Sequence, residues 1–307
     1  MKNFIYILIL VFSINSCSEY QKVLKSEDIA AKFKLGTELF DAGKFGKANR
    51  VFVQIVPKYR GKPQAQKLMY MYCRTFYETK DYYTANYQME RFVDAYPKSE
   101  KVQEIGFLAA KSYYELSPLF SKDQTETVEA LDKLQLFINT YPQSEYLDQA
   151  NILVRELDNK LEKKAFKVAL QYNLTGPYHR DYNAAITALD NFLVQFPGSS
   201  YKQEAMYYKF DSAYQLAMNS VEWKQTERVE KALTFYNSLL YVFPETQNNE
   251  DIQKMYQDLK SIQTNSKTLF ISENSITIEF QNGVLLLENN VNINKELLKN
   301  SQFAFLD

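Results

Sequence analysis

The side chains that could support catalysis are few and scattered along this 307-residue chain. The single histidine, His179, lies in a loop rich in glycine and proline, and no second histidine or paired cysteine completes a zinc site. Pairs of carboxylates such as Asp190 and Glu204 are expected by chance among 37 acidic residues. Neither a phosphate-binding glycine loop nor a nucleophile elbow occurs. The sequence therefore predicts a protein that is not an enzyme and that holds no metal or other cofactor.

Cys17 is the residue whose surroundings predict a covalent modification. Positively charged Lys2 precedes an apolar run of nine residues, 4–12, and Ser13–Cys17 then reads SINSC. A helix needs roughly 20 residues to span about 30 Å of hydrocarbon, so the run suits an export signal better than a membrane span. The segment resembles a bacterial lipoprotein signal, with Cys17 as the lipid-bearing first residue of the mature chain. An ordinary signal peptide with an incidental cysteine is the alternative.

Charge and composition argue against some partners and suggest others. The chain has 36 basic and 37 acidic residues, a formal net charge of −1 and no long block of one sign. Nothing therefore favours nucleic acid or an electrostatic grip on an anionic membrane. Aromatic residues make up 15% of the chain, with 24 tyrosines. They either fill the seams between helices or line a peptide groove, since tyrosine offers amphipathic contact area at low entropic cost.

One pattern recurs five times and predicts the fold. It consists of an alanine, apolar residues four and seven positions further on, an aromatic residue at eleven and a proline at twelve. In the third copy these residues are Ala130, Leu134, Phe137, Tyr141 and Pro142. The first copy has Arg60 in place of the proline. The offsets place one stripe along a helix, and proline marks its end, so each copy predicts an amphipathic helix that cannot bury its stripe alone.

A further helix is expected before each copy, because a small residue in an apolar run precedes each repeat alanine by 12 to 20 positions. Helix pairs with small residues facing each other are the tetratricopeptide arrangement. The predicted fold class is all-α, a tetratricopeptide-repeat α-solenoid of five helix pairs. The residues expected to set the packing and the helix ends are Gly36, Ala48, Cys73, Ala85, Pro97, Ala110, Ala130, Pro142, Ala185, Pro197, Ala232 and Pro244. With Cys17 acylated, Cys73 has no partner, and no disulfide is expected.

The repeats divide the chain into four segments. Residues 1–16 are a signal peptide, 17–26 a lipidated polar tether, 27–264 the five repeats, and 265–307 a weakly ordered extension. The repeats cover approximately 27–63, 64–99, 100–145, 146–200 and 201–264.

Two stretches depart from the regular repeat. A helix from Tyr146 to about Gln171 is longer than one pair needs, and we expect Gly176 and Pro177 to close it. In the extension, Thr268–Ile271, Ser275–Phe280 and Val284–Leu287 are β-prone, and Asn282–Gly283 is a hairpin signal.

The sequence YPQSEYLDQA at 141–150, the long helix, and HRDYNAAITALDNFLVQFPGSS at 179–200 carry a more specific resemblance. Together with the signal and the stretched third repeat, they make residues 17–259 similar to the BamD family of outer-membrane assembly lipoproteins. The resemblance implies an α-solenoid tethered by lipid to the periplasmic face of the outer membrane. It implies a scaffold whose C-terminal repeats hold the periplasmic domains of the barrel-forming subunit. Its N-terminal repeats would receive the C-terminal signal of unfolded outer-membrane proteins.

Aromatic residues on the first helices of repeats one to three are the candidates for the groove that binds such a signal. They are Phe33, Phe40, Tyr70, Phe76, Tyr77, Tyr113 and Tyr114. A neutral surface with aromatic residues suits an extended peptide that ends in an aromatic residue, although some of the seven are expected in the core.

Other functions remain open at this point. One is a repeat lipoprotein that regulates peptidoglycan synthesis or cell division, and another is a glycan-binding lipoprotein built on the same repeats. A lytic transglycosylase would need a catalytic domain, and the residues after Thr264 are too few to form one.

Overall fold

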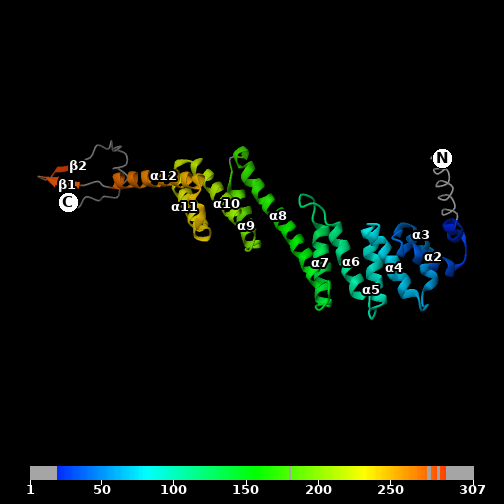
Figure 1. The fold of residues 1–307 in the computed structure, drawn as a ribbon. Helices are drawn as coiled ribbons and strands as arrows, with labels where there is room; N and C mark the ends of the chain where they lie inside the picture. Colours follow the sequence, from blue (N-terminus) through cyan, green and yellow to red (C-terminus); the bar gives the residue numbers. More distant parts are fainter. Residues whose placement is uncertain (1–18, 180, 275–277, 282–283, 288–307) are drawn as a thin grey trace, which may run out of the picture. The chain divides into compact units, whose positions relative to one another are not determined.

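The computed structural model describes residues 19–179, 181–274, 278–281 and 284–287 (Figure 1). The signal peptide, Cys17 and most of the extension lie outside the described residues. The chain divides into two compact units, Met1–Ala165 and Phe166–Asp307. Within the described part of the chain, no helix combines the length and the apolar character that a membrane crossing requires.

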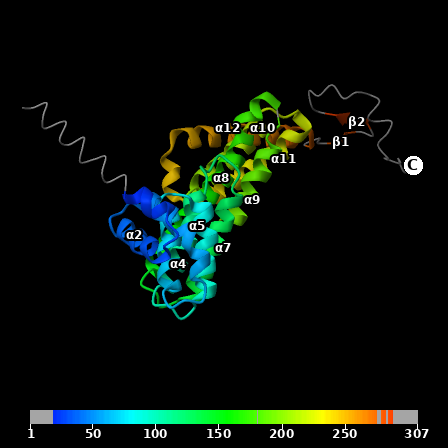
Figure 2. The same ribbon diagram turned by 90° about the vertical axis from the view of Figure 1, so that its right-hand side faces the viewer.

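The N-terminal unit consists of antiparallel helix pairs that follow one another in sequence order (Figure 1 and Figure 2). Its elements are α2 (Ile29–Asp41), α3 (Phe45–Ile55), the 3-10 turn η1 (Val56–Tyr59), α4 (Ala65–Glu78), α5 (Tyr82–Ala95), α6 (Val102–Leu116) and α7 (Thr125–Thr140). Helix α8 (Leu147–His179) begins in this unit and continues into the next.

The C-terminal unit continues the same arrangement. Its further elements are α9 (Asn183–Gln195), α10 (Lys202–Met218), α11 (Glu222–Val242), the 3-10 turn η2 (Pro244–Asn248), α12 (Glu250–Asn274), β1 (Ile278–Gln281) and β2 (Val284–Leu287). The two strands pair antiparallel, with Gln281 opposite Val284, as the hairpin signal predicts. The predicted all-α array of helix pairs is confirmed.

Small residues let the two helices of a pair approach closely. The five repeat alanines, from Ala48 to Ala232, have no exposed surface. At Gly36, an added Cβ would lie 2.4 Å from Cε1 of Phe52, so only glycine lets that ring pack against α2. Cys73 is also fully buried, and burial raises the pKa of its thiol. The four prolines of the set are exposed, so they contribute little to packing. Each follows the end of a second helix, which proline cannot continue; they are Pro97, Pro142, Pro197 and Pro244.

The expectation that Gly176 and Pro177 close the long helix is wrong, because α8 runs through both to His179. Proline this close to the end of a helix removes one backbone donor and interrupts only the last turn. Gly176 has a packing role instead: a Cβ there would lie 2.4 Å from Cε1 of Tyr182, which is itself buried. The glycine therefore lets the residue before α9 pack against the end of α8.

Three other boundaries differ from the sequence-based expectation. Helix α12 extends to Asn274 and includes Thr268–Ile271, which was expected to be β-prone; no proline or glycine stands in α12 to stop it. Helix α11 begins at Glu222, whereas the sequence favours a loop over Asn219–Gln225 between the two helices of the last pair. Residues 19–25 of the expected tether are helical, and Tyr20 is buried with Lys47 over its ring.

Candidate binding sites

The side chains considered for catalysis do not come together. His179 is exposed at the end of α8. Asp190 forms an ion pair with Lys209. Among the residues that the structure describes, no cluster of three or more His, Cys, Asp and Glu side chains could hold a metal ion.

Three of the seven groove candidates pack within repeats one and two. The ring of Phe33 stacks on Tyr59 with 5.3 Å between centroids. Phe40 meets Phe45 edge-on at 5.4 Å, and Phe76 meets the ring of buried Tyr72 at 4.9 Å. All three candidates are half-buried against the hydrophobic cluster around Phe52, so they contribute to helix packing.

Tyr70 belongs to a charged network that joins α4 to α6. Its hydroxyl donates to Glu104 Oε1 at 2.8 Å, and Lys101 Nζ lies 3.0 Å from Glu104 Oε2. Arg74 bridges Glu104 at 2.5 Å and Glu78 at 2.6 Å. Burial opposes the ionisation of Glu104, but the hydrogen bonds from Lys101 and Tyr70 and the nearby positive charges outweigh it and lower the pKa of that carboxyl. The network holds consecutive first helices in register.

Tyr77 lies at the C-terminal end of α4, where its ring meets that of Tyr82 at 5.7 Å. Burial, followed by the nearby carboxylate of Glu115, raises the pKa of Tyr77 to about 12. This residue is half-buried and remains a candidate for contact with a ligand.

Tyr113 and Tyr114 contact different neighbours of α6. Tyr114 donates a hydrogen bond to Glu156 Oε2 of α8 at 2.5 Å. Tyr113 donates to Glu90 Oε1 of α5 at 3.1 Å, and its ring lies 4.9 Å from Lys133 Nζ of α7. The seven candidates thus lie in different places. Phe33, Phe40 and Phe76 pack against core rings, whereas the tyrosines contact several different helices, and the structure does not bring the seven together in one groove.

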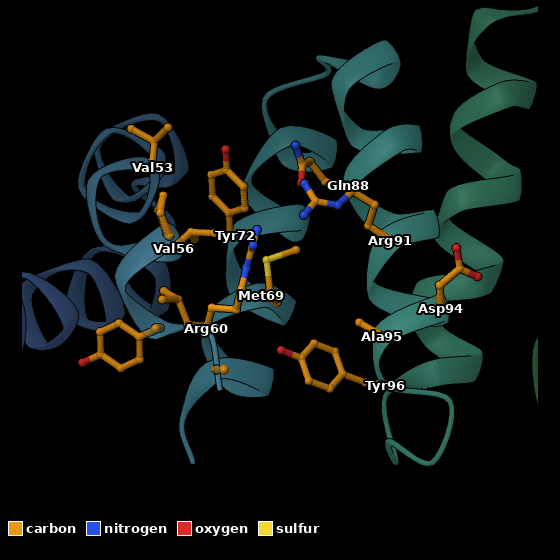
Figure 3. A pocket seen from close by; sticks show the side chains of 14 residues that line it. Val53, Val56, Arg60, Met69, Tyr72, Gln88, Arg91, Asp94, Ala95 and Tyr96 are labelled. Atoms are coloured by element: carbon orange, nitrogen blue, oxygen red, sulfur yellow. The ribbon is translucent and has the colours of Figure 1, made fainter. Parts of the chain in front are cut away.

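A cavity of about 570 Å³, the α3–α5 cavity, was missed by sequence reasoning (Figure 3). Its floor comes from α4, and Figure 3 shows Met69 near its centre with the hydroxyl end of Tyr96 directed towards it. Its lining includes Val53, Val56, Arg60, Met69, Tyr72, Arg91, Asp94 and Tyr96. Its walls come from the end of α3, the turn η1 and the loop after it, and from α5, whereas the aromatic groove candidates were expected on first helices.

The α3–α5 cavity combines an apolar floor with an excess of positive charge. Arg60 and Arg91 line it, with Asp94 as the acidic lining residue. None of these three has an ion-pair partner within the described ranges; Arg91 packs instead with its Cζ 5.4 Å from the ring of Tyr87. Arg60 stands where the other copies of the repeat have proline. This departure from the repeat is the feature of the sequence that marks the cavity. Such a cavity suits a carboxylate next to an apolar or aromatic group.

Large exposed apolar side chains occur in both units, and those of the C-terminal unit include the most exposed ones. Val194 of α9 is 81% exposed and Tyr241 of α11 is 89% exposed, and each stands nine residues after its repeat alanine. Because they share one register position on second helices, they lie on the same face of the repeat. Trp223, at the start of α11, is 78% exposed. Exposed apolar groups of this size are typical of protein interaction surfaces.

Comparison with known proteins places this arrangement in a family. The sequence model of the YfiO family, described as outer membrane lipoprotein, matches residues 26–179 and 177–267. A putative outer membrane protein assembly factor BamD of Aquifex aeolicus is 26% identical over 226 residues, which are 73% of this chain and 72% of the relative. BamD of Caulobacter vibrioides is 20% identical over 216 residues, 69% of this chain and 70% of the relative.

BamD of Rickettsia prowazekii is 21% identical over 198 residues, 64% of this chain and 77% of the relative. The family match extends over both units and over all five repeats. This chain therefore belongs to the YfiO family of outer membrane lipoproteins.

Proposed function

We propose that this chain is a non-enzymatic scaffold of outer-membrane protein assembly that binds both the barrel-forming subunit and unfolded outer-membrane proteins. The observation that carries the proposal is the family match over residues 26–267, since the relatives above are named as outer membrane protein assembly factors. An array of helix pairs with exposed apolar groups is consistent with a role in binding.

The unfolded substrate binds to the N-terminal unit, and its C-terminal segment enters the α3–α5 cavity. The apolar floor at Met69 and Tyr72 takes the terminal aromatic side chain. Arg60 and Arg91, which have no counter-ion among the described residues, face the C-terminal carboxylate. Capture of a terminal carboxylate by preplaced donors is a common mode of peptide recognition. Tyr77 and Tyr114 are the alternative contacts.

The barrel-forming subunit binds to the C-terminal unit through its periplasmic domains. A folded partner presents a rigid surface, so large side chains that already stand exposed on helices suit it better than a closed cavity does. Val194 and Tyr241 are such side chains, and Trp223 adds a third.

Acylated Cys17 anchors the protein to the periplasmic face of the outer membrane. Cys17 lies outside the described residues, but Tyr20, three positions later, is buried against the first repeat. Three extended residues span at most about 11 Å, so the anchor keeps the first repeat next to the lipid headgroups. Cys17→Ser should leave the repeats folded and release the protein from membranes that lack its partners, because stable anchoring needs the acyl chains.

A pulldown of the tagged full-length chain from solubilised membranes tests the proposal. We expect recovery of the barrel-forming subunit, and less of it with Val194→Ser/Tyr241→Ser. Recovery of a cell-wall synthase without the barrel-forming subunit would contradict the proposal and support a regulator of peptidoglycan synthesis.

A further inference from the structure

The first repeat and the short helix before it have a charge that the composition of the whole chain hides. Residues 19–63 contain ten basic and five acidic residues, so their formal charge is +5, whereas the rest of the chain has −6. Nine of the ten basic side chains are exposed, and Lys32 is buried. The nine exposed cations of repeat one are Lys22, Lys25, Lys34, Lys44, Lys47, Arg50, Lys58, Arg60 and Lys62.

Little of this positive charge is neutralised by the repeat itself. Within the described ranges, Lys58 is the only one of the nine with an ion-pair partner, since its Nζ lies 3.5 Å from Oε2 of Glu27. The side chain of Glu27 is 92% exposed, and such an exposed pair contributes little. Lys47 and Lys62 lie over tyrosine rings, which stabilise a cation but carry no negative charge of their own. The charge is therefore available to an anionic partner.

The short helix formed by residues 19–25 places two of these cations beside those of α3. Its Tyr20 is buried, and Nζ of Lys47 in α3 lies 5.5 Å from the centroid of that ring. Lys22 and Lys25 are exposed, and because they stand three positions apart, they share one face of the short helix. The packing of Tyr20 thus holds this charged face against the first repeat.

Two observations point to a membrane surface as the partner of these cations. The chain belongs to a family described as outer membrane lipoprotein. The short helix is described from residue 19, two positions after Cys17, the proposed site of acylation. The three residues from Cys17 to Tyr20 span at most about 11 Å when extended. That span is close to the Debye length of about 8 Å at physiological salt, so the cations lie near enough to act on lipid headgroups.

We propose that the exposed cations of repeat one bind the phosphate groups of anionic phospholipids in the leaflet that holds the acyl anchor. The balanced composition argued against an electrostatic contact with a membrane, but such a contact depends on the local charge, which is +5 here. The contact adds to the acyl anchor and does not replace it, because exposed charges are largely screened at physiological salt. The inference rests on the proposed anchor for the choice of a lipid surface as the partner.

Flotation with vesicles tests the proposal without the anchor. The chain from residue 17 to residue 307 carries Cys17→Ser, so that no acyl group contributes to binding. The probes are vesicles of phosphatidylethanolamine with anionic phosphatidylglycerol, and vesicles of phosphatidylethanolamine with phosphatidylcholine, which are neutral overall. In about 0.01 M salt, where the Debye length is about 30 Å, the chain should float with the anionic vesicles and not with the neutral ones. In about 0.15 M salt, most of this binding should be lost.

Two double variants separate repeat one from general charge attraction. Lys22→Gln/Lys25→Gln should weaken binding to the anionic vesicles by roughly tenfold or more, because each cation near an anionic surface contributes about fivefold. Lys98→Gln/Lys254→Gln removes the same charge at exposed positions outside repeat one and should change binding little. Circular dichroism verifies that both variants are folded. Neither Lys22 nor Lys25 lines the α3–α5 cavity, so peptide binding there should stay unchanged.

Equal flotation with the two kinds of vesicle would overturn the proposal. So would absence of flotation with anionic vesicles in low salt, or equal weakening by the two double variants. The anchor is tested separately with the acylated wild-type chain, which should bind neutral vesicles in about 0.15 M salt through its acyl chains. Its failure to do so would contradict the anchor, whatever the Cys17→Ser chain does with anionic vesicles.

Discussion

The N-terminal and C-terminal units use the same contacts to hold their repeats together. In the first unit Tyr114 of α6 donates to Glu156 of α8, and in the second Tyr214 of α10 donates to Asp258 of α12, each bridging successive first helices. In both units, an acidic residue that stands five positions after a repeat alanine forms an ion pair with a lysine. Glu90 pairs with Lys133, and Asp190 pairs with Lys209. These contacts between helices thus recur in both units.

The two units differ at an exposed position of the repeat that takes no part in these contacts. Nine residues after the repeat alanine, the N-terminal unit has Pro57, Asp94 and Asn139, whereas the C-terminal unit has Val194 and Tyr241. All five are exposed. At this position the unit that we propose for the peptide has a proline, an acid and an amide, whereas the unit that we propose for the folded partner has two apolar side chains.

The largest expected effect comes from emptying the core of one unit at a time. Phe52 and Phe210 are both fully buried, so Phe52→Ala and Phe210→Ala should each lower the free energy of unfolding by about 3–5 kcal/mol. Because repeats contact only their neighbours, each variant should shift the unfolding of its own unit far more than that of the other. Denaturant unfolding with a tryptophan probe in each unit measures this. Equal shifts at both probes would show that the units unfold as one.

Overpacking the alanine contact should have an intermediate effect in both units. Ala130→Leu and Ala185→Leu place a large side chain where two helices touch, and each should cost about 1–3 kcal/mol. Ala184→Leu is the matched control, since Ala184 is exposed next to Ala185 and should cost little. Thermal midpoints compare the three variants. An unchanged midpoint for Ala130→Leu would contradict the alignment of the repeats.

The apolar surface of the C-terminal unit should affect one partner only. Val194→Ser/Tyr241→Ser should weaken binding of the barrel-forming subunit by about 1–2 kcal/mol per side chain and leave a barrel-derived peptide bound. Binding of the purified periplasmic domains, measured by calorimetry, tests this. A variant that loses the peptide but keeps the subunit would reverse the assignment of the two units.

The smallest effect concerns the tyrosine–carboxylate contacts. The hydrogen bond to Glu156, and then burial, raises the pKa of Tyr114 to about 12; burial, and then the hydrogen bond to Asp258, raises that of Tyr214 to about 12. A raised pKa contributes stability that is complete below the unfolded value near 10 and is lost as pH rises through about 12.

Tyr114→Phe and Tyr214→Phe should therefore each cost about 0.5–1.5 kcal/mol at neutral pH. The difference from wild type should shrink between about pH 10 and pH 12. Urea unfolding across this range measures it. A difference that is constant with pH would mean that these hydroxyls are not protonated donors in the folded state.

Sequence alone predicted the interior well because the interior is periodic. The repeat alanines and the stripes that follow them located α3, α5, α7, α9 and α11 within a few residues. The end of α8 was missed because Gly176 serves the packing of Tyr182, a contact that no local pattern reveals.

The aromatic groove candidates stay predictions, because a half-buried aromatic residue has the same sequence signature in a core and in a groove. Phe33 and Phe76 proved to pack on core rings, and Tyr113 and Tyr114 on different neighbours. The α3–α5 cavity arises from helices of two different repeats, so its residues become neighbours only once the pairs are stacked.

The most direct test of the division between the units is the affinity of a barrel-derived peptide that ends in an aromatic residue, measured by fluorescence anisotropy. Arg60→Gln/Arg91→Gln should weaken it about tenfold or more, because charge-assisted hydrogen bonds to the terminal carboxylate are lost. Capping that carboxylate as an amide should weaken wild type similarly and the double variant little. Tyr77→Ala/Tyr114→Ala should retain the affinity. Equal affinity of the arginine variant and wild type, with loss in the tyrosine variant, would contradict the account and place the peptide on the first helices.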